Sequence, residues 1–408
     1  MARQWDEEYR LLAARLSDSG ISVDAVIARL KKQHIETPSW AYADAGTRFG
    51  TFQMAGAPRS VEEKFEDAAQ VHKFTGVAPS VAVHIPWDVV PDWSKMAAYA
   101  KELGVSIGSV NPNVFQDRIY QYGSLGNTNA AARSQAVEHM KECVGIMRAA
   151  NSKFLSLWFA DGTNFPGQGD MRQRKQFFIE GLSEVYKELA SDETMLIEYK
   201  PFEPAFYHTD IADWGMAFAL AQRVGDRAKV LVDLGHHLPG SNIEHIVAFL
   251  LDEGRLGGFH FNNRKYADDD LTVGSVQPYE LFLIYSELVA GENAGIANNV
   301  AYMIDQSHTL KNKIEEMIQS VVNLQSSYAK ALIVDRAALA AAQAKNDVIV
   351  AEEAIKAAYD TDVSPLLWRA RTELGIPGAE NPLLAFRASG YGDQKAAERG
   401  FGGSKGVG

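Results

Sequence analysis

The chain has 408 residues, of which 46% are hydrophobic and 23% are charged, and its formal net charge at pH 7 is -12. This composition is that of a globular protein with a sizeable core, and the length suits one large barrel or two to three ordinary domains. No basic stripe accompanies the acidic balance, which excludes nucleic acid and anionic membranes as the main binding partners.

The single cysteine indicates a reducing compartment, and the first residues indicate that no signal peptide is present. Cys143 is the single cysteine of the sequence, so no disulfide can form within one chain, and we expect it to be buried rather than reactive. Residues 1–8 are rich in charged side chains. They lack the apolar segment that a signal peptide contains. No run reaches the roughly 20 apolar residues that cross a bilayer. We therefore expect a cytoplasmic protein.

Short apolar runs separated by helical segments follow an N-terminal helix. Residues 5–33 have the apolar spacing of a helix, interrupted at residues 17–20. The predicted strands after it are 38–42, 81–84, 105–110, 154–158, 195–198, 230–233, 258–261 and 301–305. Several are almost continuously apolar, as expected of parallel strands that are buried on both faces.

Helix signals occupy the segments between these strands. Ser60 and Glu63 have the spacing of a capping box, and Asp170 begins another helix in the same way. Strands that alternate with helices imply right-handed βαβ crossovers. Eight repeats predict an α/β fold of the closed (β/α)8 TIM barrel type, with an open doubly wound sheet as the alternative.

The C-terminal part differs in composition from the barrel. Residues 330–359 are rich in alanine, leucine, valine and charged residues and predict one long helix, followed by a second helix at 365–374. We expect a catalytic barrel with the N-terminal helix at 1–328, a helical extension that makes oligomer contacts at 329–390, and a glycine-rich flexible tail at 391–408.

Residues that can bind a divalent metal end the later strands. Side chains at the carboxyl ends of barrel strands converge on one mouth, whereas in an open sheet these ends lie along a line. Three carboxylates and one imidazole suit Mn²⁺, Mg²⁺ or Co²⁺ better than a structural Zn²⁺. Such a site leaves coordination positions for two neighbouring oxygens of a polyol. The four residues are Glu198, Asp233, His260 and Asp305.

A second group of potential ligands comes close to the first in sequence. His236 follows Asp233 by three residues, and Asp268 and Asp270 are two apart on a polar loop. His236, Asp268 and Asp270 could hold another cation beside the first, as two-metal sites do at about 3.5–4 Å. Taken singly, an aspartate at a strand end is usually a helix cap or turn former. The agreement of four strand ends favours metal binding.

Other candidates have side chains suited to a sugar. Lys200 lies two residues after Glu198, so strand alternation places both on one face. A lysine there can stabilise charge on a substrate oxygen, or it can simply neutralise crowded carboxylates. His84 could move a proton during ring opening. Aromatic residues near the early strands either stack on sugars or fill the core, and these are Trp40, Phe49 and Trp158.

Longer motifs resemble a known family. The segment Glu198-Tyr199-Lys200-Pro201-Phe202-Glu203-Pro204 resembles the fifth-strand motif of xylose-isomerase-like sugar isomerases. Further segments, which span nearly the whole chain, resemble the broad-specificity bacterial branch of the L-rhamnose isomerase family. They are VHIPWD at 83–88, YGSL at 122–125, TNA at 128–130, DG at 161–162, NFPGQ at 164–168, VDLGHH at 232–237, GFHFN at 258–262, MIDQSH at 303–308 and RASGY at 387–391.

The resemblance implies two divalent metal ions, usually Mn²⁺. One, structural, would be held by Glu198, Asp233, His260 and Asp305, and the other, catalytic, by His236, Asp268 and Asp270. Lys200 would bind O1 of the open-chain sugar, His84 would contact the ring-oxygen region, and Trp40 and Trp158 would wall the pocket. Phe49 would reach into a neighbouring subunit's site, which is consistent with a homotetramer.

We therefore expect an aldose–ketose isomerase that interconverts L-rhamnose and L-rhamnulose, with activity on other sugars such as D-allose and D-allulose. Lys200, His84, His236 and Asp305 are the expected catalytic residues of a hydrogen transfer between C1 and C2. A hydride shift and an enediol route both remain open. The alternatives are a ketose 3-epimerase on the same fold and a barrel that binds metal or sugar without catalysis.

Overall fold

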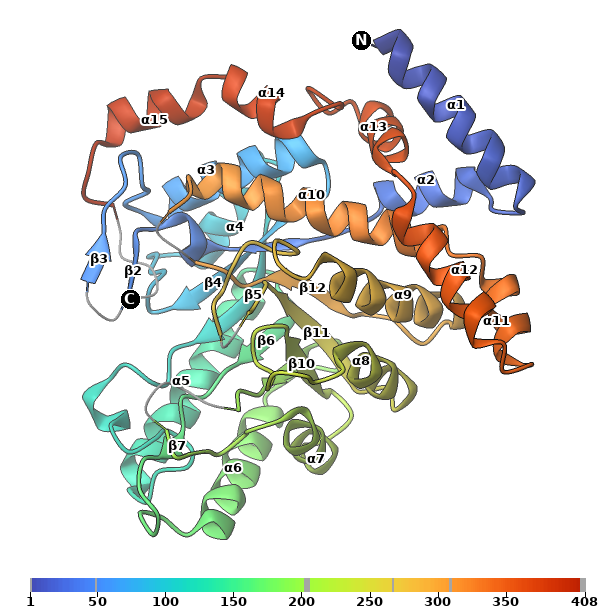
Figure 1. Cartoon of the computed structure of the whole chain (residues 1–408). Coiled ribbons are helices and arrows are strands. Elements are labelled where there is room, and N and C mark those ends of the chain that lie inside the picture. The colour runs from blue at the N-terminus through green and yellow to red at the C-terminus, as the bar shows by residue number, and fades with distance from the viewer. Residues whose placement is uncertain (1, 48–49, 202–205, 266–267, 308–309, 404–408) are drawn as a thin grey trace.

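The computed structural model describes residues 2–47, 50–201, 206–265, 268–307 and 310–403. Within these ranges eight parallel strands close into a barrel, which confirms the predicted fold (Figure 1). In spatial order they are β1 (Glu36–Pro38), β12 (Ala301–Ile304), β11 (Leu256–Phe261), β10 (Ala228–Asp233), β8 (Thr194–Glu198), β6 (Phe154–Leu157), β5 (Ser106–Pro112) and β4 (Ser80–Ile85).

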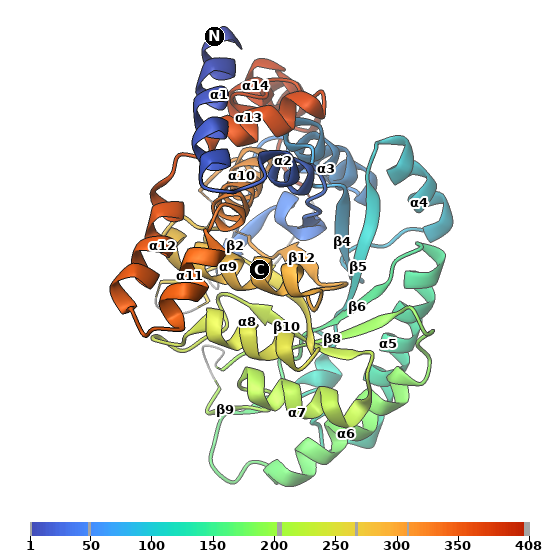
Figure 2. The same ribbon diagram turned by 90° about the vertical axis from the view of Figure 1, so that its right-hand side faces the viewer.

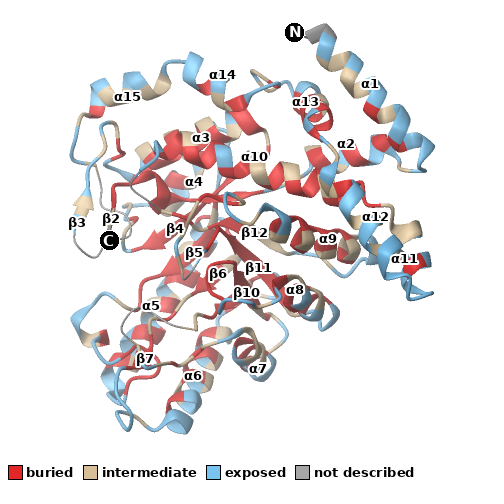
Figure 3. Ribbon diagram, in the orientation of Figure 1, coloured by how far each residue is buried: buried red, intermediate tan, exposed pale blue. Residues whose placement is uncertain are grey.

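Helices cover the outside of the barrel, as Figure 2 shows. They are α3 (Val61–Thr75), α4 (Trp93–Glu102), α5 (Ala130–Ala149), α6 (Met171–Tyr186), α7 (Trp214–Val224), α8 (Ile243–Asp252), α9 (Pro278–Ala294) and α10 (Lys313–Leu332). The strands and the inward faces of these helices form the buried core (Figure 3). Cys143 on α5 belongs to that core, as predicted. None of the described helices has the length and apolarity needed to cross a membrane.

Local capping signals mark where helices begin. The Ser60 hydroxyl accepts a hydrogen bond from the Glu63 amide at the start of α3, while the Glu63 carboxylate accepts one from the Arg59 amide rather than from Ser60. Asp170 caps α6 by accepting from the amides of residues 172 and 173. These side chains satisfy amide donors that have no partner within the helix.

The first strand is shorter than predicted. The sequence pattern placed it at 38–42, but β1 ends at Pro38, and Ser39–Tyr42 forms the 3-10 helix η1. Proline has no amide to continue the ladder, and the Tyr42 hydroxyl instead donates back to the Thr37 hydroxyl at 3.0 Å. The resulting turn brings Trp40 to the mouth of the barrel.

Short elements lie in the loops that follow the barrel strands. The hairpin β2 (Ala45–Thr47) and β3 (Gly50–Phe52) lies at the left in Figure 1. A second small pair is β7 (Gly162–Thr163) with β9 (His208–Thr209), and η2 (Arg118–Tyr120) lies between β5 and α5. At the N-terminus the predicted helix is present as α1 (Ala2–Asp18) and α2 (Val23–Lys31), broken where expected.

The C-terminal extension is helical but more broken than predicted. The expected long helix at 330–359 is wrong, because α10 ends at Leu332 and is followed by α11 (Arg336–Gln343) and α12 (Val348–Asp360). Asn346 adopts a left-handed φ of 54° and Asp347 caps the next helix, so this pair ends one helix and begins another. The predicted helix at 365–374 corresponds to α13 (Ser364–Glu373).

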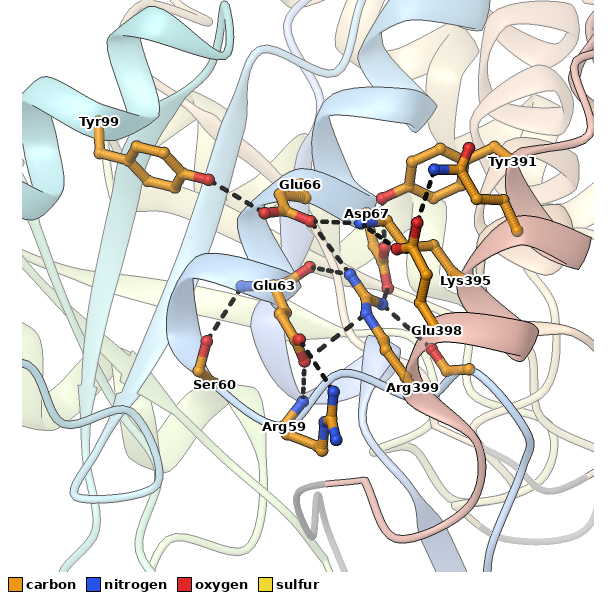
Figure 4. A network of polar contacts seen from close by, with 12 residues as sticks. Arg59, Ser60, Glu63, Glu66, Asp67, Tyr99, Tyr391, Lys395, Glu398 and Arg399 are labelled. Atoms are coloured by element: carbon orange, nitrogen blue, oxygen red, sulfur yellow. Dashed lines mark hydrogen bonds and ion pairs between the residues drawn. The ribbon is translucent and has the colours of Figure 1, made fainter.

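The predicted flexible tail at 391–408 is wrong in its first part. After α14 (Pro382–Ala388), residues Tyr391–Arg399 form α15, which packs on α3 through the polar network of Figure 4. Arg399 is buried and donates to Asp67 at 2.8 Å, and the Gly400 carbonyl accepts from the Gly56 amide. Buried ionic contacts therefore hold this segment. Residues 404–408 lie outside the described ranges.

Candidate metal centre

The four strand-end ligands predicted from the sequence converge at the mouth of the barrel. Glu198 ends β8, Asp233 ends β10, His260 lies on β11 and Asp305 follows β12. Each offers a ligand atom, and these atoms all lie within 4.8 Å of one another. The barrel thus brings together side chains that are far apart in sequence, in the space that one cation requires.

A second cluster adjoins the first and shares one of its members. It consists of Asp233, His236 and Asp268, again with ligand atoms within 4.8 Å of one another. Asp270, which the sequence grouped with His236 and Asp268, lines the same cavity but lies outside this cluster. Asp270 has a left-handed φ of 45°, and its Oδ1 accepts from the side-chain Nδ2 of Asn262 at 3.4 Å. The third member of the cluster with His236 and Asp268 is therefore Asp233 instead of Asp270.

Hydrogen bonds orient the shared ligand. The Oδ1 atom of Asp233 accepts from the Gly235 backbone N–H at 2.6 Å and from the side-chain Nδ2 of Asn262 at 2.9 Å. Its Oδ2 atom is buried and forms no hydrogen bond within the described residues, and the same holds for Oδ1 of Asp268. A Cβ on Gly235 would come within 2.5 Å of Asp268 Oδ1, so a larger residue there would displace this carboxylate. Two orphaned carboxylate oxygens in a buried site fit bound cations.

The histidine of the second cluster is oriented in the same way. His236 Nδ1 lies 2.9 Å from the Tyr199 carbonyl oxygen and can donate to it. This directs Nε2 toward Asp268, whose Oδ2 lies 3.4 Å away. Metal-binding histidines commonly donate their other ring nitrogen to a carbonyl or carboxylate. The neighbouring His237 points elsewhere, with its Nε2 2.6 Å from the Tyr199 hydroxyl.

The electrostatics of the crowded site reflect its negative charge. Burial raises the pKa of Asp233 to about 7, since the nearby His236 offsets only part of that effect. Burial lowers the pKa of His260, but the carboxylates of Glu198, Asp305 and Asp233 together outweigh it and bring this pKa to about 9. Burial raises the pKa of Asp270 and of Asp305, with other carboxylates adding to the increase. Divalent cations would relieve this crowding, so the residues fit metal ions.

A cavity of about 300 Å³ opens directly above the clusters. Of the substrate-binding residues predicted, His84, Trp40, Trp158 and Lys200 line it, while Phe49 lies outside the described residues. Sequence reasoning missed further lining residues, namely Trp87, Asn111, Pro112, Phe115, Gln116 and Ser307. Trp87 and Asn111 carry a usable signal, since each is a polar or aromatic residue at the carboxyl end of a strand.

Aromatic rings wall one side of the cavity. The ring of His84 stacks on Trp87 with centroids 3.9 Å apart and meets Trp40 edge-on at 5.6 Å. Trp158 meets Phe115 edge-on at 4.8 Å. Aromatic walls of this kind suit the apolar faces of a sugar.

His84 is held in place by a buried ion pair. Asp88 accepts from the His84 amide at 2.8 Å and from Lys64 at 2.7 Å, and Lys64 and Asp88 are both buried. Burial lowers the pKa of the His84 imidazole to about 3, so the ring is neutral near pH 7. Its Nδ1 atom has no hydrogen-bond partner within the described residues. A neutral imidazole can both donate and accept a hydrogen bond.

Lys200 lies between the carboxylates and the aromatic wall. Its Nζ is 2.8 Å from Asp268 Oδ2 and 5.1 Å from the centre of the Trp158 ring. Lys200 lines the same cavity as Glu198, as the strand alternation predicted. The ammonium can therefore reach a substrate oxygen that lies over the clusters.

Another cavity, of about 400 Å³, opens at the opposite, amino-terminal end of the barrel. Its lining includes Arg29, Tyr285 and Tyr302. Among the described residues it contains no cluster of potential metal ligands like those at the mouth. Both cavities have basic and aromatic side chains in their linings, so among the described residues the clusters of potential metal ligands distinguish the barrel mouth.

Comparisons with known proteins agree with this geometry. A family model described as xylose isomerase-like TIM barrel matches residues 65–283. The chain is 44% identical to a probable sugar isomerase of Rhizobium meliloti, over 96% of this chain and 92% of the relative. It is 24% identical to a xylose isomerase of Phocaeicola vulgatus over 50% of this chain and 49% of that protein.

Solved structures share the fold at low identity. A structure of L-ribulose 3-epimerase superposes with a TM-score of 0.53 and 13% identity, covering 78% of this chain and 98% of that chain. A D-psicose 3-epimerase of Clostridium cellulolyticum H10, with D-tagatose, superposes with a TM-score of 0.50 and 12% identity, covering 75% and 99%. At these identities the likeness concerns the barrel alone.

Proposed function

The chain belongs to the xylose isomerase-like TIM barrel family, and from this premise we propose that it is a metal-dependent aldose–ketose isomerase. The observation that carries the proposal is the convergence of two ligand clusters beneath a cavity with an aromatic wall and a lysine. The name of the relative from Rhizobium meliloti, a probable sugar isomerase, supports the same reaction class.

Two divalent cations, with Mn²⁺ the expected ion, are part of the proposal. Glu198, Asp233, His260 and Asp305 would hold one, and His236, Asp268 and Asp270 the other, with Asp233 close to both. When bound, the ions supply positive charge that polarises two neighbouring oxygens of the open-chain sugar.

The chain's own residues would bind and orient the sugar. Trp40 and Trp158 would contact its apolar faces, and Lys200 would donate from Nζ to O1, where negative charge develops during the reaction. His84, neutral and lining the cavity, would accept the proton of the O1 hydroxyl and return one to the ring oxygen as the ring opens, so that the imidazole ends neutral. The aromatic wall excludes water from the carbon atoms between which hydrogen moves.

The substrate proposed is L-rhamnose, converted to L-rhamnulose, with D-allose and D-allulose as further substrates. The motifs that resemble the L-rhamnose isomerase family support this choice, as does the size of the cavity, about 300 Å³. We also propose a cytoplasmic homotetramer in which residues 329–390 make subunit contacts and Phe49 reaches a neighbouring site.

The test is metal removal followed by selective restoration. The protein is dialysed against a chelator, and Mn²⁺, Co²⁺ or Mg²⁺ is then restored separately while ketose formation is followed from a panel of aldoses that includes L-rhamnose and D-allose. Loss of ketose formation and its return with Mn²⁺ support the proposal. A protein that converts no aldose with any ion contradicts it, and conversion of a ketose to its C3 epimer instead favours a 3-epimerase.

The route of the hydrogen is tested in deuterated water. Deuterium at carbon in the product rules out a strict hydride shift, whereas its absence excludes exchange through an enediol with solvent access.

A further inference from the structure

A buried carboxylate lies inside the barrel, where it lines the amino-terminal cavity and reaches past one strand to its neighbour. Glu36 on β1 accepts hydrogen bonds from the Ser109 amide at 3.1 Å and 3.0 Å and from the Ser109 hydroxyl at 2.5 Å. Ser109 is on β5, and β4 lies between β1 and β5 in the barrel. The contact therefore crosses the inside of the barrel. Glu36 is only 7% exposed, and burial raises its pKa, so placing a carboxyl group there opposes folding.

An irregularity in β5 makes this contact possible. The register of β4 with β5 passes from Val81↔Ile107 to Val83↔Val110, so β5 contains one extra residue between these pairs. The extra residue is a β-bulge, which turns two successive residues toward the same side. A Cβ on Gly108 would lie 1.6 Å from Glu36 Oε2, so glycine is required where the carboxylate passes.

Beyond the bulge, Asn111 faces the candidate site. It lies two residues after Ser109, on the same face of β5, and it is opposite His84 in the register with β4. Its Nδ2 donates to the Val83 carbonyl at 3.1 Å and lies 3.4 Å from the Ser109 hydroxyl. Both amide hydrogens are thus used inside the barrel wall, which leaves the Oδ1 acceptor for the cavity that Asn111 lines.

We propose that Asn111 is a substrate-binding residue whose Oδ1 accepts a hydrogen bond from a sugar hydroxyl, and that Glu36 is a positioning residue that sets Asn111 through Ser109. The sugar as ligand rests on the proposed function, whereas the positioning of Asn111 by Glu36 does not. Asn111, on β5, supplies an acceptor beside His84, whereas the strand-end ligands come from β8, β10, β11 and β12. A hydroxyl of the sugar distant from the metal ligands is the group that it would recognise.

Binding to single-deoxy sugars tests the role of Asn111. The Mn²⁺-loaded protein is titrated with D-allose and its 3-, 4-, 5- and 6-deoxy derivatives by calorimetry, and turnover is measured in parallel. We expect one deoxy derivative to bind the unchanged protein about tenfold more weakly than D-allose, the effect of one lost hydrogen bond. Asn111→Leu keeps the volume without the acceptor and should bind D-allose and that derivative equally.

The proposal is overturned if Asn111→Leu discriminates among the deoxy sugars as the unchanged protein does, or if the unchanged protein binds none of them. A protein that binds the sugars but converts no aldose contradicts the proposed isomerase, while the role of Asn111 in binding stands.

Variants of Glu36 and Ser109 test the positioning. Glu36→Gln keeps an acceptor for the Ser109 amide and should retain sugar affinity, whereas Glu36→Ala should raise KM about tenfold with metal content unchanged. Ser109→Ala is a milder change. It removes the hydroxyl that joins Glu36 to Asn111 but keeps the Glu36 side chain, and it provides the same test if Glu36→Ala does not fold. Glu36→Ala combined with Asn111→Leu should bind no more weakly than Asn111→Leu alone, because the two residues act as one unit.

Crystal structures of these variants provide a readout that needs no activity. The Asn111 amide should be displaced in Glu36→Ala and in Ser109→Ala and should keep its position in Glu36→Gln. An unmoved Asn111 in both truncated variants, or additive losses of affinity in the double variant, overturns the positioning role.

Discussion

The indole of Trp40 donates a hydrogen bond to the carboxylate of Asp305, with 2.9 Å between Nε1 and Oδ1. One residue of the cavity wall thereby orients a residue of the ligand cluster. Partners of metal ligands commonly contribute about 10–100-fold to metal affinity. We predict that Trp40→Phe, which keeps an aromatic ring but loses the donor, weakens Mn²⁺ binding about tenfold in a competition titration with a chelator.

Trp87→Phe is the matched control, because the Trp87 indole donates to Gln116 and not to a ligand residue. Equal losses of Mn²⁺ affinity in the two variants would contradict a specific role for the bond to Asp305.

Asp233 belongs to both ligand clusters, whereas Asp268 belongs to one. We predict that Asp233→Asn lowers the bound metal by both equivalents, while Asp268→Asn loses a single equivalent. Asparagine has an amide NH2 in place of one carboxylate oxygen. The substitution therefore removes a negative charge and a strong ligand without changing the shape of the side chain. Elemental analysis of protein dialysed in Mn²⁺ buffer measures the stoichiometry. Asp269→Asn, on the same loop but outside both clusters, should retain both ions.

His84 is buried against three aromatic rings, and burial lowers its pKa to about 3. Because this folded-state pKa lies below the ordinary 6.5, the neutral ring contributes stability above pH 6.5, and that contribution is lost as the pH falls toward 3. We predict that ¹⁵N spectra show a neutral imidazole for His84 down to about pH 4, with the signal assigned by its absence from His84→Gln. A His84 signal that titrates near 6.5 would refute the assignment of a neutral ring.

Arg399 anchors α15 to α3 through a buried ion pair with Asp67, in which both side chains are almost inaccessible (Figure 4). Burial raises the pKa of Asp67 to about 6 even with Arg399 beside it. Arg399→Met leaves this carboxylate without its partner, so we predict a loss of about 3 kcal/mol in the free energy of unfolding at pH 8. Urea titration measures it.

The pH dependence follows from the sign of the Asp67 shift. A carboxyl whose folded-state pKa is raised stabilises the fold at low pH and loses that contribution as the pH rises through the folded value, here about 6. Without Arg399 the pKa rises further, so the loss in Arg399→Met should be smaller at pH 5 than at pH 8. The control is Arg387→Met, because the Arg387–Glu315 pair is exposed and should contribute less than about 1 kcal/mol.

The strand ends were predictable because their signals are local. A run of three apolar residues that ends in a carboxylate, as at Glu198 and Asp233, indicates both a buried parallel strand and a side chain at its carboxyl end. Eight repeats of strand and helix favour a closed barrel over an open sheet, and closure brings such ends together. The break between α11 and α12 had an equally local signal, because Asn346 favours a left-handed turn and Asp347 can cap a helix. The prediction of one long helix rested on composition and did not use this signal.

The contact of Glu36 with Ser109 carried no such signal. The two residues are 73 positions apart, and their meeting depends on a bulge in β5 and on a glycine that leaves room for the carboxylate. Asn111 could be placed at a strand end from the sequence, but the direction of its amide could not, since that follows from hydrogen bonds to Val83 and Ser109.

The sequence by itself thus determined the barrel, the residue types at its mouth and the chemistry that they suit. Periodicity, caps and strand-end residues act over a few positions and can be recognised one segment at a time. Only the tertiary structure decided that Asp233 joins both clusters, that Trp40 holds Asp305, and that Glu36 lies beneath Asn111. These relationships depend on the register of strands and on the packing across the barrel, which no single segment encodes.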